Sequence, residues 1–221
     1  RTWGVPGQAR TAREGQYQPG PGAAFFERMR QILGRLPLIA EDLGVVIPEV
    51  TQLREQFGLP GMRVLQFALS GDQRSNVHLP HNHERNSVVF TATHDNDTTV
   101  GWFRGRNDEE GLRANKSTGG NSGASREEQR NALRYVGGSA RNIHWSMIRQ
   151  TLGSVANTAI IPAQDLLGLG STARMNVPGK ARGNWRWRAR AGALDAALAE
   201  RLAELAETFG RASATSPTTP S

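Results

Sequence analysis

Four short apolar runs constrain the fold of this chain more than any other feature of its sequence. They cover residues 36–40, 62–69, 87–92 and 158–162, and sequence with helical spacing lies between them. Runs of this length suit strands that are buried on both faces, as in parallel sheets. Short strands that alternate with helices predict an α/β fold. Four strands are too few for a closed eight-stranded barrel and would suit half of one.

The segments between the runs complete this picture. Apolar spacing predicts a helix over 25–33, a helix that starts at Pro48 and ends at Gly58, helical sequence from 127 to about 152, and an amphipathic C-terminal helix over 194–209. Residues 1–22 show no strand or helix period and are predicted to be a loop. A Gly-, Asn- and Ser-rich loop is expected at 116–124, and a disordered tail at 212–221.

Composition limits the class of protein. Hydrophobic residues make up 37%, and the chain has 25 glycines and 11 prolines, so we expect a small core with much loop. The chain has no cysteine, which excludes disulfides, thiolate metal sites and cysteine nucleophiles. That composition suits a reducing compartment, and we expect a cytoplasmic protein. No apolar run approaches the length needed to cross a bilayer, so no membrane partner is expected.

The charge of the chain raises the question of a polyanionic partner. Net charge is +7, which makes nucleic acid the first partner to consider. The basic residues are spread singly along the sequence, however, with local bunching only at 180–190. We therefore expect no nucleic-acid partner and keep a basic nucleic-acid-binding protein as an alternative, which a steep salt dependence of binding would reveal.

Polar residues follow several of the predicted strands. In a parallel barrel, catalytic groups sit at the carboxyl ends of the strands. Such pairs stand after the first, third and fourth apolar runs: Glu41-Asp42, His94-Asp95 and Gln164-Asp165. This coincidence indicates a site at one end of the sheet.

Glu41 and Asp95 are the catalytic candidates that this pattern singles out. Two carboxylates that face one cleft are how glycosidases combine an acid with a nucleophile or base. The alternative is that Asp42 and Asp97 cap helices, as aspartates often do, and that Glu41 is simply solvated. The pattern alone leaves both interpretations open.

Three further motifs have a functional and a structural interpretation. The histidines of HLPHNH at 78–83 suggest a metal site, but Pro80 interrupts them, so we favour a substrate-lining loop and expect no metal. The GxGxxA pattern at 168–173 resembles a dinucleotide fingerprint but is followed by Pro178 and Gly179, and we discount it. Trp185 and Trp187 in GNWRWR could stack on sugar rings or bases, or pack on the sheet.

Six motifs, in order, resemble those of the amylomaltases, the 4-α-glucanotransferases of glycoside hydrolase family 77. The resemblance extends from about Gly15 to Gly210. The motifs are IAEDLGVVIPEV at 39–50, FGLPGMRVLQFA at 57–68, LPHN at 79–82, THDNDTTVGW at 93–102, ARMNVPG at 173–179 and GNWRWR at 183–188.

The resemblance implies a retaining enzyme on a (β/α)8 TIM barrel that transfers α-1,4-glucan segments between maltodextrins. Its partners would be maltooligosaccharides, and it would need no metal or organic cofactor. The chain would then supply about strands 5–8 with a closing C-terminal helix. On this interpretation residues 1–22 are a loop segment of the barrel, 23–211 are its C-terminal half and 212–221 are the tail.

The resemblance also implies roles for single residues. Glu41 matches the general acid/base of the family, which protonates the leaving glycosidic oxygen and then deprotonates the incoming hydroxyl. Asp95 matches the aspartate that binds sugar hydroxyls and stabilises the oxocarbenium-like state, and His94 matches a histidine that binds the same sugar. Asn82, Asn176 and Trp185 are expected to bind substrate as well.

One part of the family pattern is missing. The nucleophile of the family is an aspartate upstream of AEDLG, and this chain has no aspartate before Asp42. Arg1 is expected to lie just downstream of that motif. Because a retaining mechanism needs its nucleophile, the chain alone is expected to be inactive. The alternative is a non-catalytic glucan-binding remnant.

Overall fold

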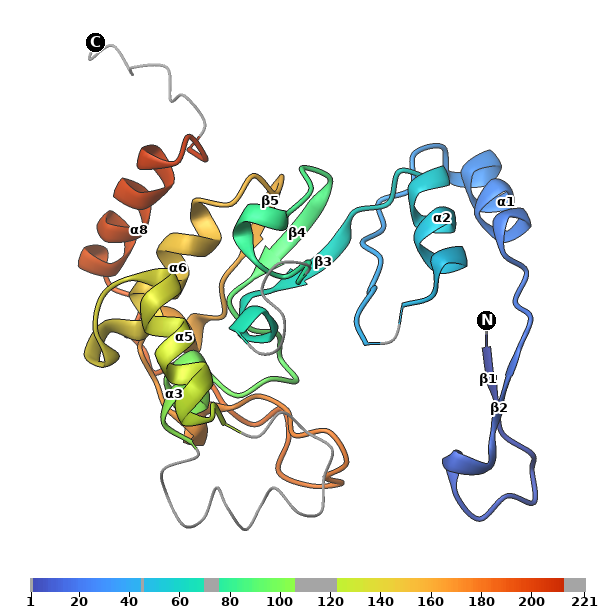
Figure 1. Ribbon diagram of the computed structural model, residues 1–221, viewed down its shortest axis with the longest axis horizontal. Helices are drawn as coiled ribbons and strands as arrows, with labels where there is room; N and C mark the ends of the chain where they lie inside the picture. The colour runs from blue at the N-terminus through green and yellow to red at the C-terminus, as the bar shows by residue number, and fades with distance from the viewer. Residues whose placement is uncertain (1, 45, 70–75, 106–122, 213–221) are drawn as a thin grey trace. The chain divides into compact units, whose positions relative to one another are not determined.

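The computed structural model describes residues 2–44, 46–69, 76–105 and 123–212. The chain divides into two compact units, Arg1–Met62 and Arg63–Ser221. Figure 1 labels the elements of each. The two units are described separately.

The first unit begins with a pair of short strands. β1 (Thr2–Gly4) pairs antiparallel with β2 (Gln16–Gln18), and the Trp3 and Tyr17 rings meet edge to face across the pair at 4.8 Å. The short 3-10 helix η1 (Ala12–Glu14) lies between them. The prediction of a loop over 1–22 is therefore wrong, because three-residue strands are too short to show an alternating pattern.

Two helices follow, as predicted. α1 (Ala23–Leu33) ends at Gly34, which adopts the left-handed backbone that glycine tolerates best, and α2 (Pro48–Gln56) carries proline in its first turn. Phe57, just after α2, packs against Phe26 of α1 at 5.1 Å. The guanidinium of Arg30 lies over the same ring at 5.0 Å.

The first predicted strand, over 36–40, is absent. The segment is irregular, its Ala40 N–H donates to the carbonyl of Pro60, and the Ile39 side chain is exposed. Pro37 supplies the reason, since it has no N–H to donate to a sheet and interrupts the run. Within the described residues the sheet of the chain therefore has three strands where four were predicted.

The other three apolar runs form this sheet in the order β3-β4-β5. β4 (Ser87–Phe90) pairs in parallel with β5 (Thr158–Ile160), which confirms the predicted parallel α/β arrangement for these two strands. β3 (Gly61–Val64) is shorter than the predicted run, because the chain continues as the 3-10 helix η2 (Leu65–Leu69). Val64 and Val89 are fully buried, whereas Ile160 is 40% exposed, although its run was predicted to be buried on both faces.

The helices of the second unit gather around α6. α3 (Thr99–Arg104), α5 (Arg126–Val136) and α8 (Ala196–Thr208) all contact α6 (Ile143–Leu152), as Figure 1 shows. The predicted helical stretch from 127 to 152 is thus two helices. They separate at Gly137 and Gly138, both of which have positive φ, and the 3-10 helix η4 (Ala140–Asn142) follows.

Local sequence sets these helix starts. Ser125 and Glu128 form a capping box at the start of α5, and Asp195 accepts a hydrogen bond from the Leu198 N–H to cap α8. The main core lies between η2, α3, α5 and α6 and includes Leu65, Trp102 and Met147. A second cluster around Trp145 and Ile148 packs against the apolar face of α8.

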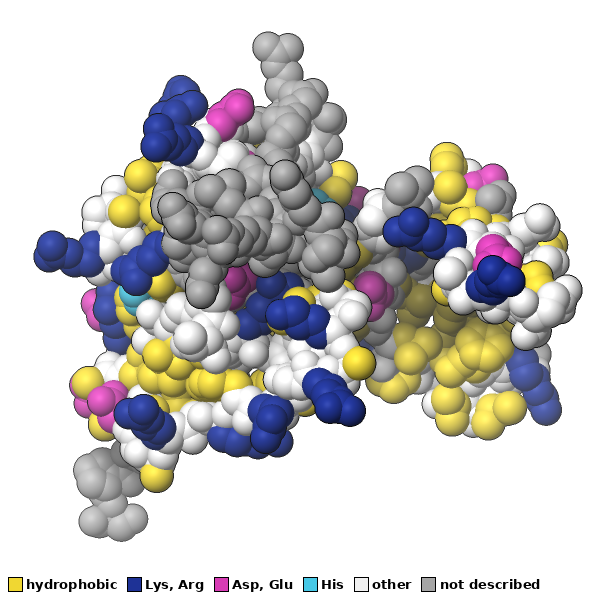
Figure 2. Space-filling view, turned by 90° about the horizontal axis from the view of Figure 1, so that it is seen from below, with side chains coloured by type: hydrophobic (Ala, Val, Ile, Leu, Met, Phe, Trp, Pro, Cys, Tyr) yellow, Lys and Arg dark blue, Asp and Glu magenta, His cyan; other side chains and the backbone are white. Residues whose placement is uncertain are grey.

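Two of the predictions concern segments that lie largely outside the described residues. The loop at 116–124 and the tail at 212–221 lie outside the described residues, apart from 123, 124 and 212. No helix in the described ranges is long and apolar enough to cross a membrane. In Figure 2 the Lys and Arg side chains lie singly or in small groups, and hydrophobic side chains gather in patches on both units.

Candidate functional site

The loop after β4 is held by its own short hydrogen bonds. The Thr93 N–H and hydroxyl both donate to Oδ1 of Asn96, at 2.8 and 2.7 Å, and the Asn96 N–H donates back to the Thr93 carbonyl. Asparagine and threonine side chains often close turns in this way. The turn presents His94 and Asp95 to solvent, with 56% and 49% of their side chains exposed.

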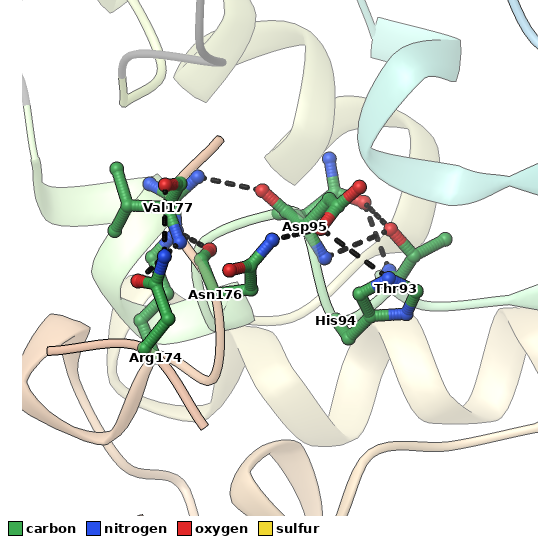
Figure 3. Close-up of polar contacts among 8 residues, drawn as sticks. Thr93, His94, Asp95, Arg174, Asn176 and Val177 are labelled. Atoms are coloured by element: carbon green, nitrogen blue, oxygen red, sulfur yellow. Dashed lines mark hydrogen bonds and ion pairs between the residues drawn. The ribbon is translucent and has the colours of Figure 1, made fainter. Parts of the chain in front are cut away.

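A second segment, far along the chain, holds this loop from the other side (Figure 3). Asn176 Nδ2 donates to Asp95 Oδ1 at 2.5 Å, and Arg174 Nη2 donates to the Asp95 carbonyl at 2.6 Å. The Asn176 N–H donates to the carbonyl of His94 at 3.1 Å. Two stretches about 80 residues apart in sequence therefore form one surface.

His94 and Trp185 extend this surface. His94 Nε2 lies 3.3 Å from Asp95 Oδ1, and the His94 ring faces the Trp185 ring with centroids 5.1 Å apart. The Trp185 N–H donates to the Met175 carbonyl at 2.7 Å, which ties the tryptophan to the same crossing segment. The Trp185 ring does not pack into a core, since the residue is 54% exposed.

Trp185 also has an unusual backbone. It is the only non-glycine residue with positive φ in the described part of the chain, at 62°. An L-residue in this region costs about 1–2 kcal/mol, so surrounding contacts must enforce it. The hydrogen bond to Met175 and the contact with His94 are such contacts, and they fix an exposed aromatic ring beside two polar side chains.

Behind the loop lies a buried carboxylate, Asp165, in the short helix α7 (Ala163–Leu166) after β5. It accepts hydrogen bonds from the Thr91 hydroxyl, the Thr99 N–H and the Thr99 hydroxyl, at 2.5, 2.7 and 2.8 Å. Burial raises the pKa of Asp165, while these hydrogen bonds oppose the rise and the nearby Asp97 adds to it. Asp165 thus connects the ends of β4 and β5 to the start of α3.

Asp97 has a separate partner. Its Oδ2 accepts a hydrogen bond from the Ser171 hydroxyl at 2.6 Å, in the 3-10 helix η5 (Ser171–Ala173). Thr98, and not Asp97, is the N-cap residue of α3, because its hydroxyl accepts the Gly101 N–H. The alternative interpretation of Asp97 as a helix cap is therefore wrong.

Glu41 belongs to the first unit. It is exposed, and none of the described residues bonds to its carboxylate. Its neighbour Asp42 accepts the Met62 N–H at 2.6 Å and lies 3.6 Å from Arg54 Nε. Asp42 is therefore a half-buried structural group and not a helix cap, and a side chain at Gly61 would collide with its carboxylate.

The histidines of HLPHNH have different partners. His83 Nε2 donates to the His78 carbonyl at 2.9 Å and its Nδ1 accepts from the Ser154 hydroxyl at 2.6 Å, and burial lowers the pKa of His83. His78 Nδ1 accepts the Val64 N–H, and His81 Nδ1 bonds to the Tyr135 hydroxyl. These contacts give each ring a structural role within the described chain.

Asn82 lies in the same segment, in the 3-10 helix η3 (Pro80–Asn82). Its Nδ2 donates to the Asn76 carbonyl at 3.0 Å, so this part of its amide closes the local turn. The predicted site residues thus divide: His94, Asp95, Asn176 and Trp185 come together, Asn82 bonds within its own segment, and Glu41 stands in the other unit.

Several residues that build the surface were not predicted from the sequence. Arg174 could have been found from its place two residues before Asn176, and Thr93 and Asn96 from their turn-forming spacing. The sequence marks Asp165 only as a polar residue after a predicted strand. Its burial against two threonines has no signal in the sequence.

The exposed surface is suited to a polyhydroxylated ligand. No described residue donates to Oδ2 of Asp95, which leaves this oxygen to accept a hydroxyl, and the imidazole of His94 offers another polar contact. The Trp185 ring supplies an apolar face next to them. A flat aromatic ring with adjacent acceptors and donors is a common form of small-molecule site.

Comparison with known proteins gives one consistent result. A family model described as 4-alpha-glucanotransferase, of glycoside hydrolase family 77, matches residues 1–194. The 4-alpha-glucanotransferase of Synechocystis is 46% identical over 212 residues, which cover 95% of this chain and 38% of the relative. That of Thermus thermophilus is 41% identical over 211 residues, covering 95% and 40%.

A solved structure agrees with these relatives. Amylomaltase from Streptococcus agalactiae in complex with acarbose superposes with a TM-score of 0.81 at 29% identity, covering 96% of this chain and 39% of that one. The chain therefore spans about two fifths of the length of the relatives that it matches.

Proposed function

Since this chain belongs to the 4-alpha-glucanotransferases of glycoside hydrolase family 77, we propose that it provides the acid/base glutamate and a sugar-binding surface for transfer of α-1,4-glucan segments between maltodextrins. The observation that carries the proposal is the surface of Asp95, His94, Asn176 and Trp185. It joins a carboxylate oxygen to which no described residue donates, an imidazole and an exposed ring in one place. Maltooligosaccharides are the partners of this surface.

Each group has a role in the proposed reaction. Glu41, exposed and without a fixed partner in the described chain, protonates the leaving oxygen and then takes the proton of the incoming 4-hydroxyl. Asp95 accepts hydroxyls of the sugar at the cleaved bond, and its negative charge stabilises the oxocarbenium-like transition state. His94 and Asn176 orient the same sugar, and Trp185 packs against a ring face. Asn82 acts at the edge of the site.

The covalent step needs one more group. A retaining mechanism requires a carboxylate nucleophile, and no aspartate precedes Asp42 in the 221 residues. We place that nucleophile in sequence beyond these residues, and the 221-residue chain alone is then inactive.

The sheet β3-β4-β5 with α8 corresponds to part of the C-terminal half of a TIM barrel, about strands 5–8. The cytoplasm is the proposed location, in keeping with a chain without cysteine.

A chimera tests this proposal. The chain replaces the 212 residues that it matches in the Synechocystis relative, and transfer between maltotriose molecules is followed by product chromatography. The chimera should form glucose and longer maltodextrins. Glu41→Gln keeps the shape of the side chain but removes its proton, and should lower the rate on the order of 10²-fold or more. Glu27→Gln, an exposed glutamate of α1, is the matched control and should leave the rate unchanged.

A glucan-binding remnant is the second candidate. It is favoured by one observation, that Asp95, His94, Asn176 and Trp185 all lie in the unit of residues 63–221, without Glu41. The same chimera separates the two functions. A remnant would bind maltohexaose and give no transfer in the chimera, and near-normal transfer by the Glu41→Gln chimera would reject the acid/base assignment.

A further inference from the structure

A cavity of about 460 Å³ lies in the second unit, away from the loop that carries Asp95. Its walls come from α6 and α8, which lie side by side in Figure 1, and from η4. Its lining combines the apolar side chains of Trp145 and Leu205 with polar ones, among them Asn142, Ser146, Arg149, Arg201, Glu204 and Thr208. We call this cavity the α6–α8 pocket.

Its two arginines are held by aromatic rings. The guanidinium of Arg201 lies over the Trp145 ring, 3.8 Å from its centroid, and that of Arg149 lies over Phe209 at 5.1 Å. Stacking uses one face of a guanidinium and leaves its N–H edge free to donate. No carboxylate lies within 4.0 Å of either group in the part of the chain that the structure describes, although Glu204 lines the same pocket.

The position of α8 is fixed, which makes the pocket a defined site. Arg211, just beyond α8, donates to the carbonyls of Leu152, Ser154 and Ala156 at 2.6, 2.6 and 2.9 Å. Phe209 packs on the backbone at Gly153, where an added Cβ would meet its ring at 3.1 Å. The end of α8 is thereby fastened to the end of α6, the two helices that carry Arg201 and Arg149.

Arg201 affects the pKa of a neighbouring histidine, His144. Burial is the main cause that lowers this pKa, and the positive charges of Arg201 and of Arg104 in α3 lower it further. His144 Nδ1 is buried without a hydrogen-bond partner in the described chain. The pKa of His144 should therefore change when a charged ligand binds at Arg201.

We propose that the α6–α8 pocket binds a phosphate monoester of a sugar. Two guanidiniums without a carboxylate partner suit a doubly charged oxyanion, which arginine binds through paired N–H groups. The volume exceeds what inorganic phosphate fills and suits a small organic ligand. Glu204 and Asn142 offer acceptors for the several alcohol hydroxyls of a sugar, which inorganic phosphate lacks. This site is independent of the proposed transferase site.

Calorimetric titration of the full 221-residue chain tests the proposal with three probes: glucose 6-phosphate, inorganic phosphate and glucose. Glucose 6-phosphate should bind most tightly, phosphate more weakly and glucose not measurably. Arg149→Gln and Arg201→Gln should each weaken both phosphate ligands by about tenfold. Arg130→Gln, an exposed arginine of α5 outside the pocket, is the charge-matched control and should change neither.

Glu204→Gln distinguishes the contribution of the phosphate group to binding from that of the sugar. It removes a negative charge from the pocket and a strong hydroxyl acceptor, so phosphate should bind more tightly and the advantage of glucose 6-phosphate over phosphate should shrink. The NMR titration of His144 gives a readout that does not depend on variants. Ligand bound at Arg201 should raise the pKa of His144 towards its ordinary value.

Three results would overturn the proposal. They are equal losses in Arg130→Gln and Arg201→Gln, an unshifted His144 titration at saturating glucose 6-phosphate, and binding of glucose as tight as that of its phosphate. Arg201→Lys keeps the charge and loses the planar fork, so it should bind with intermediate affinity. This variant replaces Arg201→Gln in the test if Arg201→Gln fails to fold.

Discussion

Asp165 accepts both the backbone N–H and the hydroxyl of Thr99, at 2.7 and 2.8 Å, so a residue after β5 fixes the first turn of α3. The loop that carries His94 and Asp95 lies between β4 and α3, and the Thr91 hydroxyl bonds to the same carboxylate at the β4 end. The exposed loop of the proposed site is therefore supported by a fully buried carboxylate.

Removing this carboxylate should destabilise the second unit. Asp165→Ala leaves three buried donors unpaired, which should cost about 3 kcal/mol in the free energy of unfolding. Asp165→Asn keeps one acceptor and should cost less. Thermal unfolding at a single protein concentration would measure both. Equal stability of wild type and Asp165→Ala would show that the cluster is not stabilising.

The same residue predicts a pH dependence. Because the folded-state pKa of Asp165 is raised, the folded protein holds its proton more tightly than the unfolded chain does. The stability linked to this proton is fully present below the ordinary pKa of 3.8 and is lost as pH rises through the folded-state value. Between pH 4 and 7, wild type should lose stability relative to Asp165→Asn. The prediction would be wrong if the free energy of unfolding of the two proteins changed equally between pH 4 and 7.

Trp185 allows backbone strain to be separated from binding. Trp185→Gly and Trp185→Ala both remove the ring and should weaken maltohexaose binding by about tenfold. The glycine variant should be more stable than the alanine variant by about 1 kcal/mol, because only glycine accepts φ of 62° without strain.

Trp187 is the matched control for this pair, since its φ is not positive. There the order should reverse, with alanine more stable than glycine. Unchanged maltohexaose affinity in both Trp185 variants would remove this ring from the proposed site.

The isolated chain should be catalytically silent. Incubated with maltotriose, it should give neither glucose nor longer maltodextrins, because the proposed nucleophile lies beyond its 221 residues. Product chromatography with a long incubation would detect slow transfer. Sustained transfer that disappears in Glu41→Gln would show that the nucleophile has been misplaced.

Self-association is expected for the chain on its own. β3 and β5 are the outer strands of the described sheet, and outer strands present unpaired backbone groups. Apolar side chains of α1 are also uncovered, with Phe25, Ile32 and Leu33 exposed by 49%, 64% and 59%. Sedimentation velocity should show dimers or larger species.

A charge on the β5 edge should weaken this association. Ile160→Lys should shift the distribution towards monomer, whereas Val155→Lys, an exposed position just before β5, should not. A wild-type monomer with strongly protected amides throughout β5 would refute the prediction.

The sequence predicts the elements of this fold better than their contacts. The runs at 87–92 and 158–162 are identifiable as strands because they are short and apolar, and the one proline in them, Pro162, stands at the end of its run, after β5. They pair as predicted. The run at 36–40 is also short and apolar, but Pro37 lies inside it. Because proline has no N–H to donate to a sheet, the run does not form a strand. Gly137 and Gly138 mark the break between α5 and α6 that helical periodicity alone conceals.

The site follows the same division. His94 and Asp95 were predicted from their place after a strand, and Asn176 and Trp185 from motifs. The crossing of the Arg174–Asn176 segment over that loop depends on long-range contacts that local patterns do not encode. The left-handed backbone of Trp185 is likewise invisible in the sequence, because tryptophan is among the residues least expected there.

The separation of 81 residues between Asp95 and Asn176 has a consequence for synthesis of the chain on the ribosome. β4 and β5 are complete once residue 160 has been made, and their pairing can begin at that point. The partner of Asp95 arrives 16 residues later, and the ring that covers His94 arrives nine residues after that. A nascent chain released between these points would hold a paired sheet and a bare loop, so the proposed binding surface forms only after the sheet that supports it.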